Sequence, residues 1–261
     1  MDRLILFIYI NKIMSSKLIK IREVSELLGV SIDTLRRWDK SGKFSSIRTG
    51  PQGHRFYKFS DVEAKLNSAT NYLNLATEWV RSQNGFELDP QIYCETRDVF
   101  QSRLEVLQFE LGKILPLEGI VSLVIAVAGE IGNNSYDHNL GNWPDIMGIF
   151  FYYDEKNKSI ILADRGQGIL STLKHVRPEL NSSTEAMKIA FTETISGRQD
   201  EARGNGLKFV KSVIINNPLS LDFQTGNAFL HIKQNDSNPI IRETDIPIKG
   251  CFAKIKIEKT Q

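Results

Sequence analysis

The chain has 261 residues, of which 41% are hydrophobic and 25% are charged. This composition is ordinary for a globular protein and leaves room for one large domain or two modest ones. The net charge is only +2, but residues 1–68 carry 13 lysines and arginines against 7 acidic residues, whereas the remainder carries 20 against 24. A basic N-terminal part on an acidic body predicts that the basic part meets an anionic partner, with chance variation of the surface as the alternative.

Two cysteines, Cys94 and Cys251, are too few for a disulfide framework, and no CxxC or histidine-rich spacing indicates a metal site. We therefore expect a cytoplasmic protein. Residues 4–10 are strongly apolar, but a membrane span needs about 20 such residues, so we expect no membrane partner. No cleavage site of the signal-peptide type follows them. We interpret residues 1–16 as an extension, either a short extra strand or sequence upstream of a natural start at Met14, which the N-terminal mass of the native protein would decide.

A helix-turn-helix pattern follows the extension. Apolar residues at helical spacing end at Gly29, which breaks the first helix. Ser31 is a suitable N-cap for a second helix over residues 31–40. Leu35 and Trp38 lie three residues apart and should face the core, which leaves the arginines between them exposed.

A turn-rich stretch then leads to alternating residues at 54–59, which predict a two-stranded wing. Asp61 should cap a third helix. A recognition helix needs hydrogen-bond donors at base edges, and a wing needs cations near the DNA backbone. The candidate DNA-contacting residues are Thr34, Arg36 and Arg37 on the second helix, and His54, Arg55, Tyr57 and Lys58 in the wing.

The pairing of LGVSIDTLRRWDKSG with a later GHRFY resembles the winged helix-turn-helix of the MerR and excisionase families over about 50 residues. The resemblance implies DNA binding, usually by a dimer on a palindromic site. A helix-turn-helix that only docks another protein is the alternative. We assign residues 17–67 to this domain.

Residues 68–115 are predicted to form a helical connector between two domains. Its second half carries apolar side chains at helical spacing. These residues are Val99, Phe100, Leu104, Leu107 and Leu111. We expect this amphipathic helix to pack on the C-terminal domain, with homodimerisation as the alternative.

Three polar motifs mark the C-terminal part, and the first is AGEIGNNSYDHN at residues 128–139. Glu130, Asn134 and Asp137 fall on one face of the predicted helix because they are separated by four and three residues. An amide oxygen is a hard ligand for Mg²⁺, and a carboxylate can orient or deprotonate an attacking water or hydroxyl. A solvated polar face at the end of the helix is the alternative.

The second motif is DRGQGI at residues 164–169, directly after a short apolar strand. Asp164 at the strand end could accept a hydrogen bond from the exocyclic amine of adenine. Gly166 and Gly168 would let the backbone approach a nucleotide closely and adopt a positive φ. An ordinary turn from a strand into a loop is the alternative.

The third motif is RGNGLKFVKSVI at residues 203–214. Gly204 and Gly206 precede an amphipathic helix, whose free backbone N–H groups and dipole favour phosphate. Arg203 and Lys208 would add positive charge.

In this order and spacing, the motifs resemble the N, G1 and G2 boxes of the histidine-kinase-like (GHKL) ATP-binding fold, which histidine kinases, gyrase, MutL and anti-sigma kinases share. The resemblance covers residues 116–258 and implies ATP and Mg²⁺ as cofactors. It implies that Glu130 is the catalytic general base, that Asn134 is the metal ligand, and that residues 170–202 form a mobile lid, against which Phe191 could pack. The implied cofactor-binding residues are Asn134, Asp137, Asp164, Gly166, Gly168, Ile169, Arg203, Gly204, Asn205, Gly206 and Leu207.

The sequence departs from this family at Gly250 and Cys251, where many members have a Gly-Thr pair, which puts one hydroxyl contact to adenine in doubt. No histidine is followed by Glu or Asp in a dimerisation-helix pattern, so a self-phosphorylating sensor kinase is not expected. The expected fold class is α+β: a winged helix-turn-helix, the helical connector, and a two-layer α/β sandwich of the GHKL (Bergerat) type over residues 116–261.

The leading functional hypothesis is a regulator that binds DNA and uses Mg·ATP binding and lid closure as a switch. A homodimer is a candidate assembly for it. One alternative is a serine/threonine kinase of the anti-sigma type that acts on a separate partner protein. The other is a non-catalytic ATP-binding module.

Overall fold

The computed structural model divides the chain into two compact units, Met1–Asn71 and Tyr72–Gln261. We treat each unit by itself. The predicted extension over residues 1–16 lies outside the residues that the structure describes. The described residues are 17–28, 30–42, 44–48, 50, 53–62, 72–114, 118–155, 157–193 and 206–258.

The N-terminal unit is a helix-turn-helix with a small antiparallel sheet. Its elements are β1 (Leu18–Lys20), α2 (Ile21–Leu28), α3 (Ile32–Lys40), β2 (Ile47–Arg48) and β3 (Arg55–Lys58). Ser31 caps α3, because its side chain accepts a hydrogen bond from the Thr34 backbone N–H. Of the predicted third helix, residues 59–62 are helical and the rest lies outside the described residues.

The sheet of this unit has one strand more than the predicted two-stranded wing. Its order is β1-β3-β2, and Ile19 of β1 is paired with Tyr57 of β3. Both side chains point into a core that also contains Val24, Leu35 and Val62. The extra strand forms because the alternation around Ile19 gives β1 one buried face, a pattern too short to recognise in three residues.

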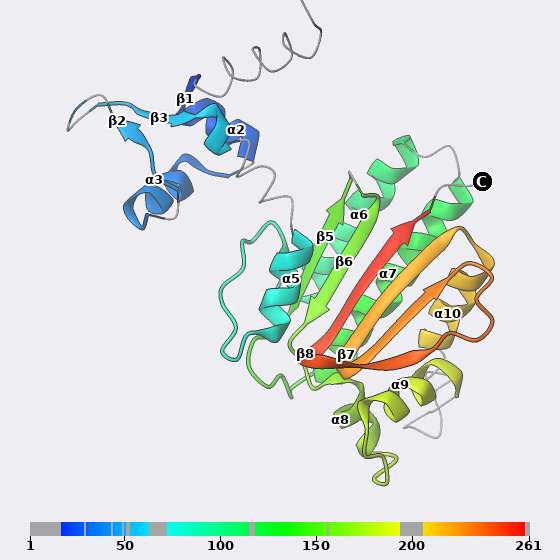
Figure 1. The fold of residues 1–261 in the computed structure, drawn as a ribbon. Coiled ribbons are helices and arrows are strands. Elements are labelled where there is room, and N and C mark those ends of the chain that lie inside the picture. The colour runs from blue at the N-terminus through cyan, green and yellow to red at the C-terminus, as the bar shows by residue number, and fades with distance from the viewer. Residues whose placement is uncertain are drawn as a thin grey trace, which may run out of the picture. The chain divides into compact units, whose positions relative to one another are not determined.

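The C-terminal unit is built on an antiparallel sheet that has, in the described part of the chain, five strands in the order β4-β5-β6-β8-β7. Figure 1 shows β5, β6, β8 and β7 of this sheet. The strands are β4 (Tyr93–Cys94), β5 (Ile149–Asp154), β6 (Ser159–Asp164), β7 (Leu219–Lys233) and β8 (Ile241–Ile257). The helices are α5 (Tyr72–Arg81), α6 (Arg97–Ile114), α7 (Glu118–Asn139), α8 (Gly168–Lys174), α9 (Ser183–Thr192) and α10 (Gly206–Asn216).

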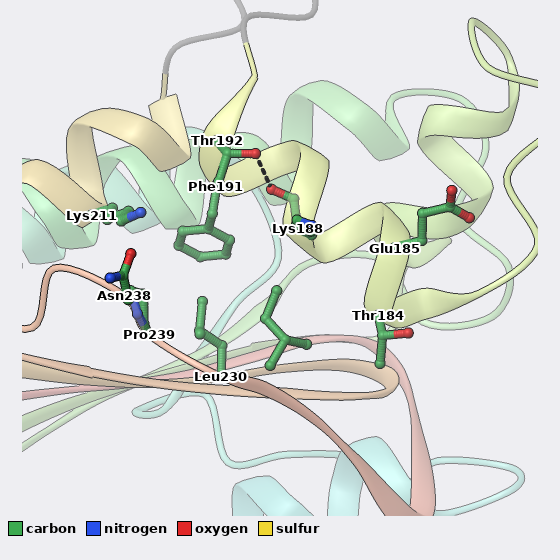
Figure 2. Close-up of a pocket in the computed structure, with 10 residues that line it drawn as sticks. Thr184, Glu185, Lys188, Phe191, Thr192, Lys211, Leu230, Asn238 and Pro239 are labelled. Atoms are coloured by element: carbon green, nitrogen blue, oxygen red, sulfur yellow. Dashed lines mark hydrogen bonds between the residues drawn. The ribbon is translucent and has the colours of Figure 1, made fainter.

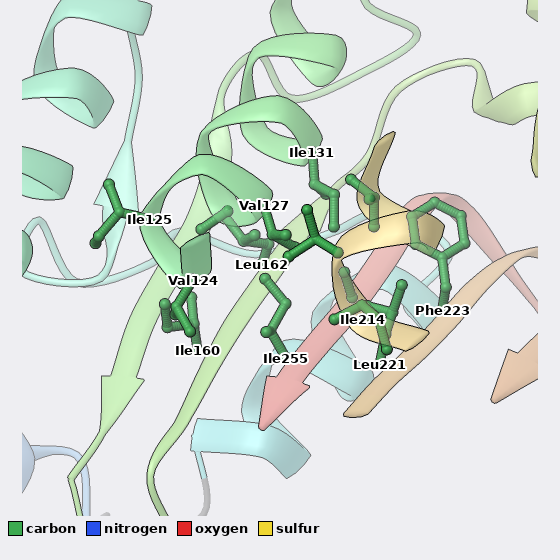
Figure 3. Close-up of a cluster of buried hydrophobic side chains, with 14 of the residues drawn as sticks. Val124, Ile125, Val127, Ile131, Ile160, Leu162, Ile214, Leu221, Phe223 and Ile255 are labelled. Carbon is green, nitrogen blue, oxygen red and sulfur yellow. The ribbon is translucent and has the colours of Figure 1, made fainter. Parts of the chain in front are cut away.

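Both faces of the central strand β6 are covered, so the unit has three layers where two were expected. Ile160 and Leu162 pack in the large core under α6, α7 and α10, part of which Figure 3 shows. Ile161 and Ala163 point the other way and pack against α5, where Trp79 is fully buried. The side chains of β6 are buried on both faces, so the strand needs a cover on each face, and α5 provides the second one. The α+β class is confirmed.

The segment predicted as a connector belongs to the C-terminal unit from residue 72 onward. β4 pairs with β5 and extends the sheet at one edge. Helix α6 packs along α7 through its predicted apolar residues, except that Val99 is 38% exposed. The ring of Phe100 occupies the space beside Gly132, where a Cβ atom would come within 2.3 Å of the ring. Burial of this face makes α6 part of the core rather than a spacer.

The described part of the predicted lid, residues 170–193, contains two packed helices. Leu180, Ala186 and Ile189 form a small core between α8 and α9, and Phe191 packs edge-on against Phe223 of β7, with ring centroids 5.4 Å apart. These contacts pack the described part of the predicted lid against its own small core and against β7, and residues 194–202 lie outside the described residues. The mobility of the lid stays a prediction. In the part of the chain that the structure describes, no helix is long and apolar enough to cross a membrane.

Candidate functional sites

The predicted DNA-contacting residues of α3 lie mostly at the surface. Arg36 and Arg37 are exposed, and Arg36 forms an ion pair with Asp33 one turn earlier. Thr34 is half-buried and shares a hydrogen bond with the Ser31 hydroxyl. The helix therefore offers two guanidinium groups to an anionic partner.

The wing residues divide into exposed and structural ones. His54 and Lys58 are exposed, as expected for contacts to DNA. The expectation for Tyr57 is wrong, because its side chain is only 1% exposed and stacks on Phe44 with ring centroids 4.8 Å apart. Alternation along β3 places Tyr57 inside and Lys58 outside. The Arg55 guanidinium is also engaged within the domain, because it donates a hydrogen bond to a carboxylate of α3.

That carboxylate is Asp39, a residue that the sequence did not single out. Its side chain is 8% exposed and accepts hydrogen bonds from Arg55 at 2.8 Å, Arg48 at 2.7 Å and the Ser46 backbone N–H at 2.8 Å. Burial alone would raise the pKa of Asp39, but the hydrogen bonds from Ser46 and the two arginines outweigh it and hold the pKa well below its ordinary value. Asp39 thus joins α3 to both strands of the wing.

In the C-terminal unit, the three motifs come together around one cavity of about 110 Å³ between α7, α8, α10 and the sheet. Five predicted residues line it, and they come from all three motifs. They are Asn134, Asp164, Gly168, Ile169 and Leu207. Lining residues that sequence reasoning missed include Ser135, Asn139, Thr172 and Phe223. Cys251, where the sequence departs from the Gly-Thr pair, also lines the cavity.

Asp164 lies at the end of β6 with its carboxyl group only 2% exposed. It accepts hydrogen bonds from the Ser135 hydroxyl and the Gly166 backbone N–H, each at 2.8 Å. Burial raises the pKa of Asp164 to about 6, although these hydrogen bonds and one from the Cys251 backbone N–H act in the opposite direction. Gly250 packs on the same group with φ +61°, and a Cβ atom there would lie 2.3 Å from the Asp164 carboxyl.

The two glycines of the second motif are needed for different structural reasons. Gly168 has φ +73°, as expected, which a residue with a Cβ atom rarely adopts. Gly166 is not in the positive-φ region, so that part of the expectation is wrong, whereas its close approach to a nucleotide stays a prediction. It is required because the Asn139 side chain lies against it, within 2.4 Å of where a Cβ atom would stand.

Glu130 and Gly206 lie against each other across α7 and the start of α10. A Cβ atom at position 206 would stand 1.7 Å from Glu130 Oε1. The carboxylate thus reaches the N-terminal end of α10 only because residue 206 is glycine. Arg203, Gly204 and Asn205, which precede it, lie outside the described residues.

Asp137 is not part of the cavity wall. Its carboxylate forms an ion pair with Arg97 of α6 on the outer side of α7. The helical-face argument grouped it with Glu130 because the two are seven residues apart, but α6 provides a partner that the sequence could not place. We assign Asp137 a structural role.

A hydroxyl group lies close to Gly250 and Cys251, the two residues that stand where the resemblance led us to expect a Gly-Thr pair. Thr225 of β7 is the pairing partner of Cys251, and its side chain is buried. Its hydroxyl donates to the Gly250 carbonyl at 2.9 Å and accepts from the Ile169 backbone N–H at 3.2 Å. Thr225 therefore fastens the loop after Asp164 to β7. This role of Thr225 depends on the pairing of β7 with β8, which brings together residues that are 26 positions apart in the sequence.

A second, larger cavity of about 590 Å³ lies between α9, α10 and the turn after β7 (Figure 2). Lys188 and Lys211 line it, and Figure 2 shows Phe191 between them and Leu230 below. None of the predicted site residues that the structure describes lines it. Among the residues that the structure describes, no group of three or more His, Cys, Asp or Glu side chains could hold a metal ion.

Comparison with known proteins identifies the N-terminal unit. Residues 20–57 match the model of the MerR family regulatory protein. These residues form a MerR-type helix-turn-helix domain. A segment of 36 residues is also 56% identical to the type II methyltransferase M.Eco47II of Escherichia coli, which covers 14% of this chain and 9% of the methyltransferase. The chain therefore spans under a tenth of that relative, and the interpretation of residues 72–258 depends on their own geometry.

Proposed function

We propose that this chain is a DNA-binding regulator whose C-terminal unit binds Mg·ATP as a switch. The MerR-type domain and the exposed Arg36, Arg37, His54 and Lys58 support binding to DNA. Phosphate contacts from such side chains supply most of the affinity for duplex DNA. The excess of basic residues in residues 1–68 agrees with this role.

One observation carries the nucleotide-binding half of the proposal. Asn134, Asp164 and Leu207 belong to motifs that are 30 and 43 residues apart, yet they line one cavity. Core packing alone does not require a buried carboxyl, an amide and a glycine-fed helix at one place. A carboxyl group that burial holds near a pKa of 6 is costly, and such groups gather at functional sites.

We assign the base, the metal ion and the phosphates of an adenine nucleotide to different residues of this site. The cavity is smaller than the roughly 300–1,000 Å³ of typical ligand pockets, so we assign it to the base, with Asp164 accepting from the exocyclic amine. Asn134 would be the protein ligand of Mg²⁺, which keeps waters and takes its other ligands from phosphates. The N-terminal end of α10 at Gly206 would face the phosphates. Bound ATP would supply a phosphoryl group for slow hydrolysis, with Glu130 positioning the water.

Calorimetric titration of Mg·ATP into the full chain tests this site. Asp164→Asn should weaken binding at least about tenfold, because it changes the acceptor that we assign to the amine. Asp137→Asn is the matched control and should bind like the wild type, since Asp137 is paired with Arg97. Equal affinity of the wild type and Asp164→Asn would contradict the assignment. Transfer of labelled phosphate to a partner protein, rather than to water, would favour the kinase alternative.

A further inference from the structure

Asp164 and Arg165 are consecutive residues that face opposite sides of the sheet. Successive side chains of a strand alternate between its two faces. Asp164 points toward α7 and lines the cavity, where Ser135 donates to it. Arg165 points toward α5, and its side chain is completely buried. One dipeptide therefore connects the wall of the cavity with the layer behind the sheet.

Arg165 binds the C-terminal end of α5. Its guanidinium donates to the Trp79 carbonyl, to the Gln83 carbonyl at 3.4 Å and to the Asp145 carboxylate at 2.6 Å. The last carbonyls of a helix have no partner within the helix and attract positive charge. The guanidinium also lies 5.8 Å from the centre of the Trp79 ring. These contacts fix the end of α5 to the end of β6.

A second cation reaches the same acceptors from β8. Lys249 donates to the Gln83 carbonyl at 2.6 Å and to the Asp145 carboxylate at 2.9 Å. It directly precedes Gly250, which packs on Asp164. Burial would raise the pKa of Asp145, but the hydrogen bonds from Arg165, Lys249 and the Ile146 backbone N–H outweigh it and lower the pKa to about 2. The ends of β6 and β8, which line the cavity at Asp164, therefore both bind the Asp145 carboxylate through a cation.

We infer that Arg165 is a positioning residue that couples a ligand at Asp164 to the C-terminal end of α5 on the opposite face of the sheet. This inference rests on the proposed function, because it needs a nucleotide at Asp164. A ligand that holds the ends of β6 and β8 together reduces the local opening of every element fastened to them. Helix α5 is the first described element after residue 62, so it receives the chain that comes from the DNA-binding domain.

Hydrogen exchange of the full chain with and without saturating Mg·ATP measures this coupling. In the wild type, ATP should slow exchange of the amides of residues 79–86 by about tenfold. Arg165→Lys keeps the charge but loses the planar fork that binds three acceptors at once. We expect this variant to bind ATP within about threefold of the wild type while losing most of the ATP-dependent slowing at residues 79–86.

The controls separate coupling from general loosening. Arg103→Lys is matched, because Arg103 also donates to backbone carbonyls of this part of the chain, those of Pro90 and Gln91, but it comes from α6. It should leave the response to ATP unchanged. If Arg165→Lys does not fold, Lys249→Met takes its place, since it removes the second cation from the same carbonyl.

The outcomes distinguish this inference from the proposed function. A wild type that binds ATP by calorimetry but shows no change at residues 79–86 overturns the coupling and leaves the nucleotide site standing. A full response in both Arg165→Lys and Lys249→Met also overturns it. A wild type that binds no ATP overturns the proposed function, and this inference with it. Loss of the response in Arg165→Lys but not in Arg103→Lys establishes the coupling.

Discussion

At the scale of single residues, Asp164 combines a proposed role in nucleotide binding with a cost to stability. Its pKa of about 6 lies above the value of 3.8 expected for an exposed carboxyl. A raised pKa in the folded state means that the folded protein loses stability as the pH rises from about 4 through 6, because the unfolded chain ionises first. The loss at pH 7 should be about 3 kcal/mol, since one pKa unit corresponds to about 1.4 kcal/mol.

Urea unfolding at pH 4.5 and pH 7.5 measures this loss. A Trp38→Phe background leaves Trp79 and Trp143, both of which lie in the C-terminal unit. Between the two pH values, the free energy of unfolding should fall more in the wild type than in Asp164→Asn, which carries no titrating group. Parallel pH profiles of the two proteins would show that the carboxyl is not buried as described.

Replacement of the exposed Arg37 tests whether this surface of the N-terminal unit binds DNA. Its replacement by alanine should weaken binding to duplex DNA about tenfold at fixed salt and reduce the salt dependence, because one phosphate or base contact is lost. Arg177→Ala removes a partly exposed arginine of the C-terminal unit that is paired with Glu193, and it should have little effect. An equal loss in both variants would indicate only the effect of net charge.

At the scale of elements, Asp39 fastens α3 to the wing. We expect Asp39→Asn to lower the stability of the N-terminal unit by about 2 kcal/mol, because hydrogen bonds between charged groups are weakened and two arginines lose their counter-ion. The pKa of Asp39 is lowered in the folded state, so this stabilisation is present above about pH 4 and is lost as the pH falls further. Thermal unfolding followed by Trp38 fluorescence checks both statements, and an unchanged melting temperature at pH 7 would contradict them.

The two glycines that face carboxyl groups should respond differently to replacement. Gly250→Ala should destabilise the C-terminal unit by about 2 kcal/mol or more, because it combines φ +61° with a clash against the backbone of Asp164. Gly206→Ala meets only the flexible end of Glu130, so stability should change by less than about 1 kcal/mol. The Glu130 carboxylate is displaced, however, and ATP hydrolysis should be lost. Denaturant unfolding and phosphate release separate the two effects.

These elements also show how much the sequence determines. Ser31, Leu35 and the α6 face were predictable because capping and helical spacing are local. The order and type of the three motifs were sufficient to place Asn134 and Asp164 at one cavity. Thr225 was not predictable, because its role depends on which strands pair, and neither was the pairing of Asp137 with Arg97, which depends on where α6 packs. Tyr57 was misassigned because β3 is too short for its alternation to indicate which face is buried.

At the scale of the whole molecule, the proposal joins a MerR-type domain to a nucleotide pocket in one chain. A switch requires that the nucleotide has a different affinity for the DNA-binding and the non-binding states. By linkage, DNA should then change the affinity for ATP by the same factor that ATP changes the affinity for DNA. Helix α5, fastened to the pocket strands through Arg165, is the element on which such a difference would act.

The most direct measurement is the affinity of the full chain for a DNA duplex, enriched by this protein from a random-sequence pool, with and without Mg·ATP at one stated salt concentration. The account predicts that Mg·ATP shifts the dissociation constant at least about fivefold in the wild type and leaves it unchanged in Asp164→Asn. A dissociation constant that is the same with and without nucleotide in the wild type would contradict the account.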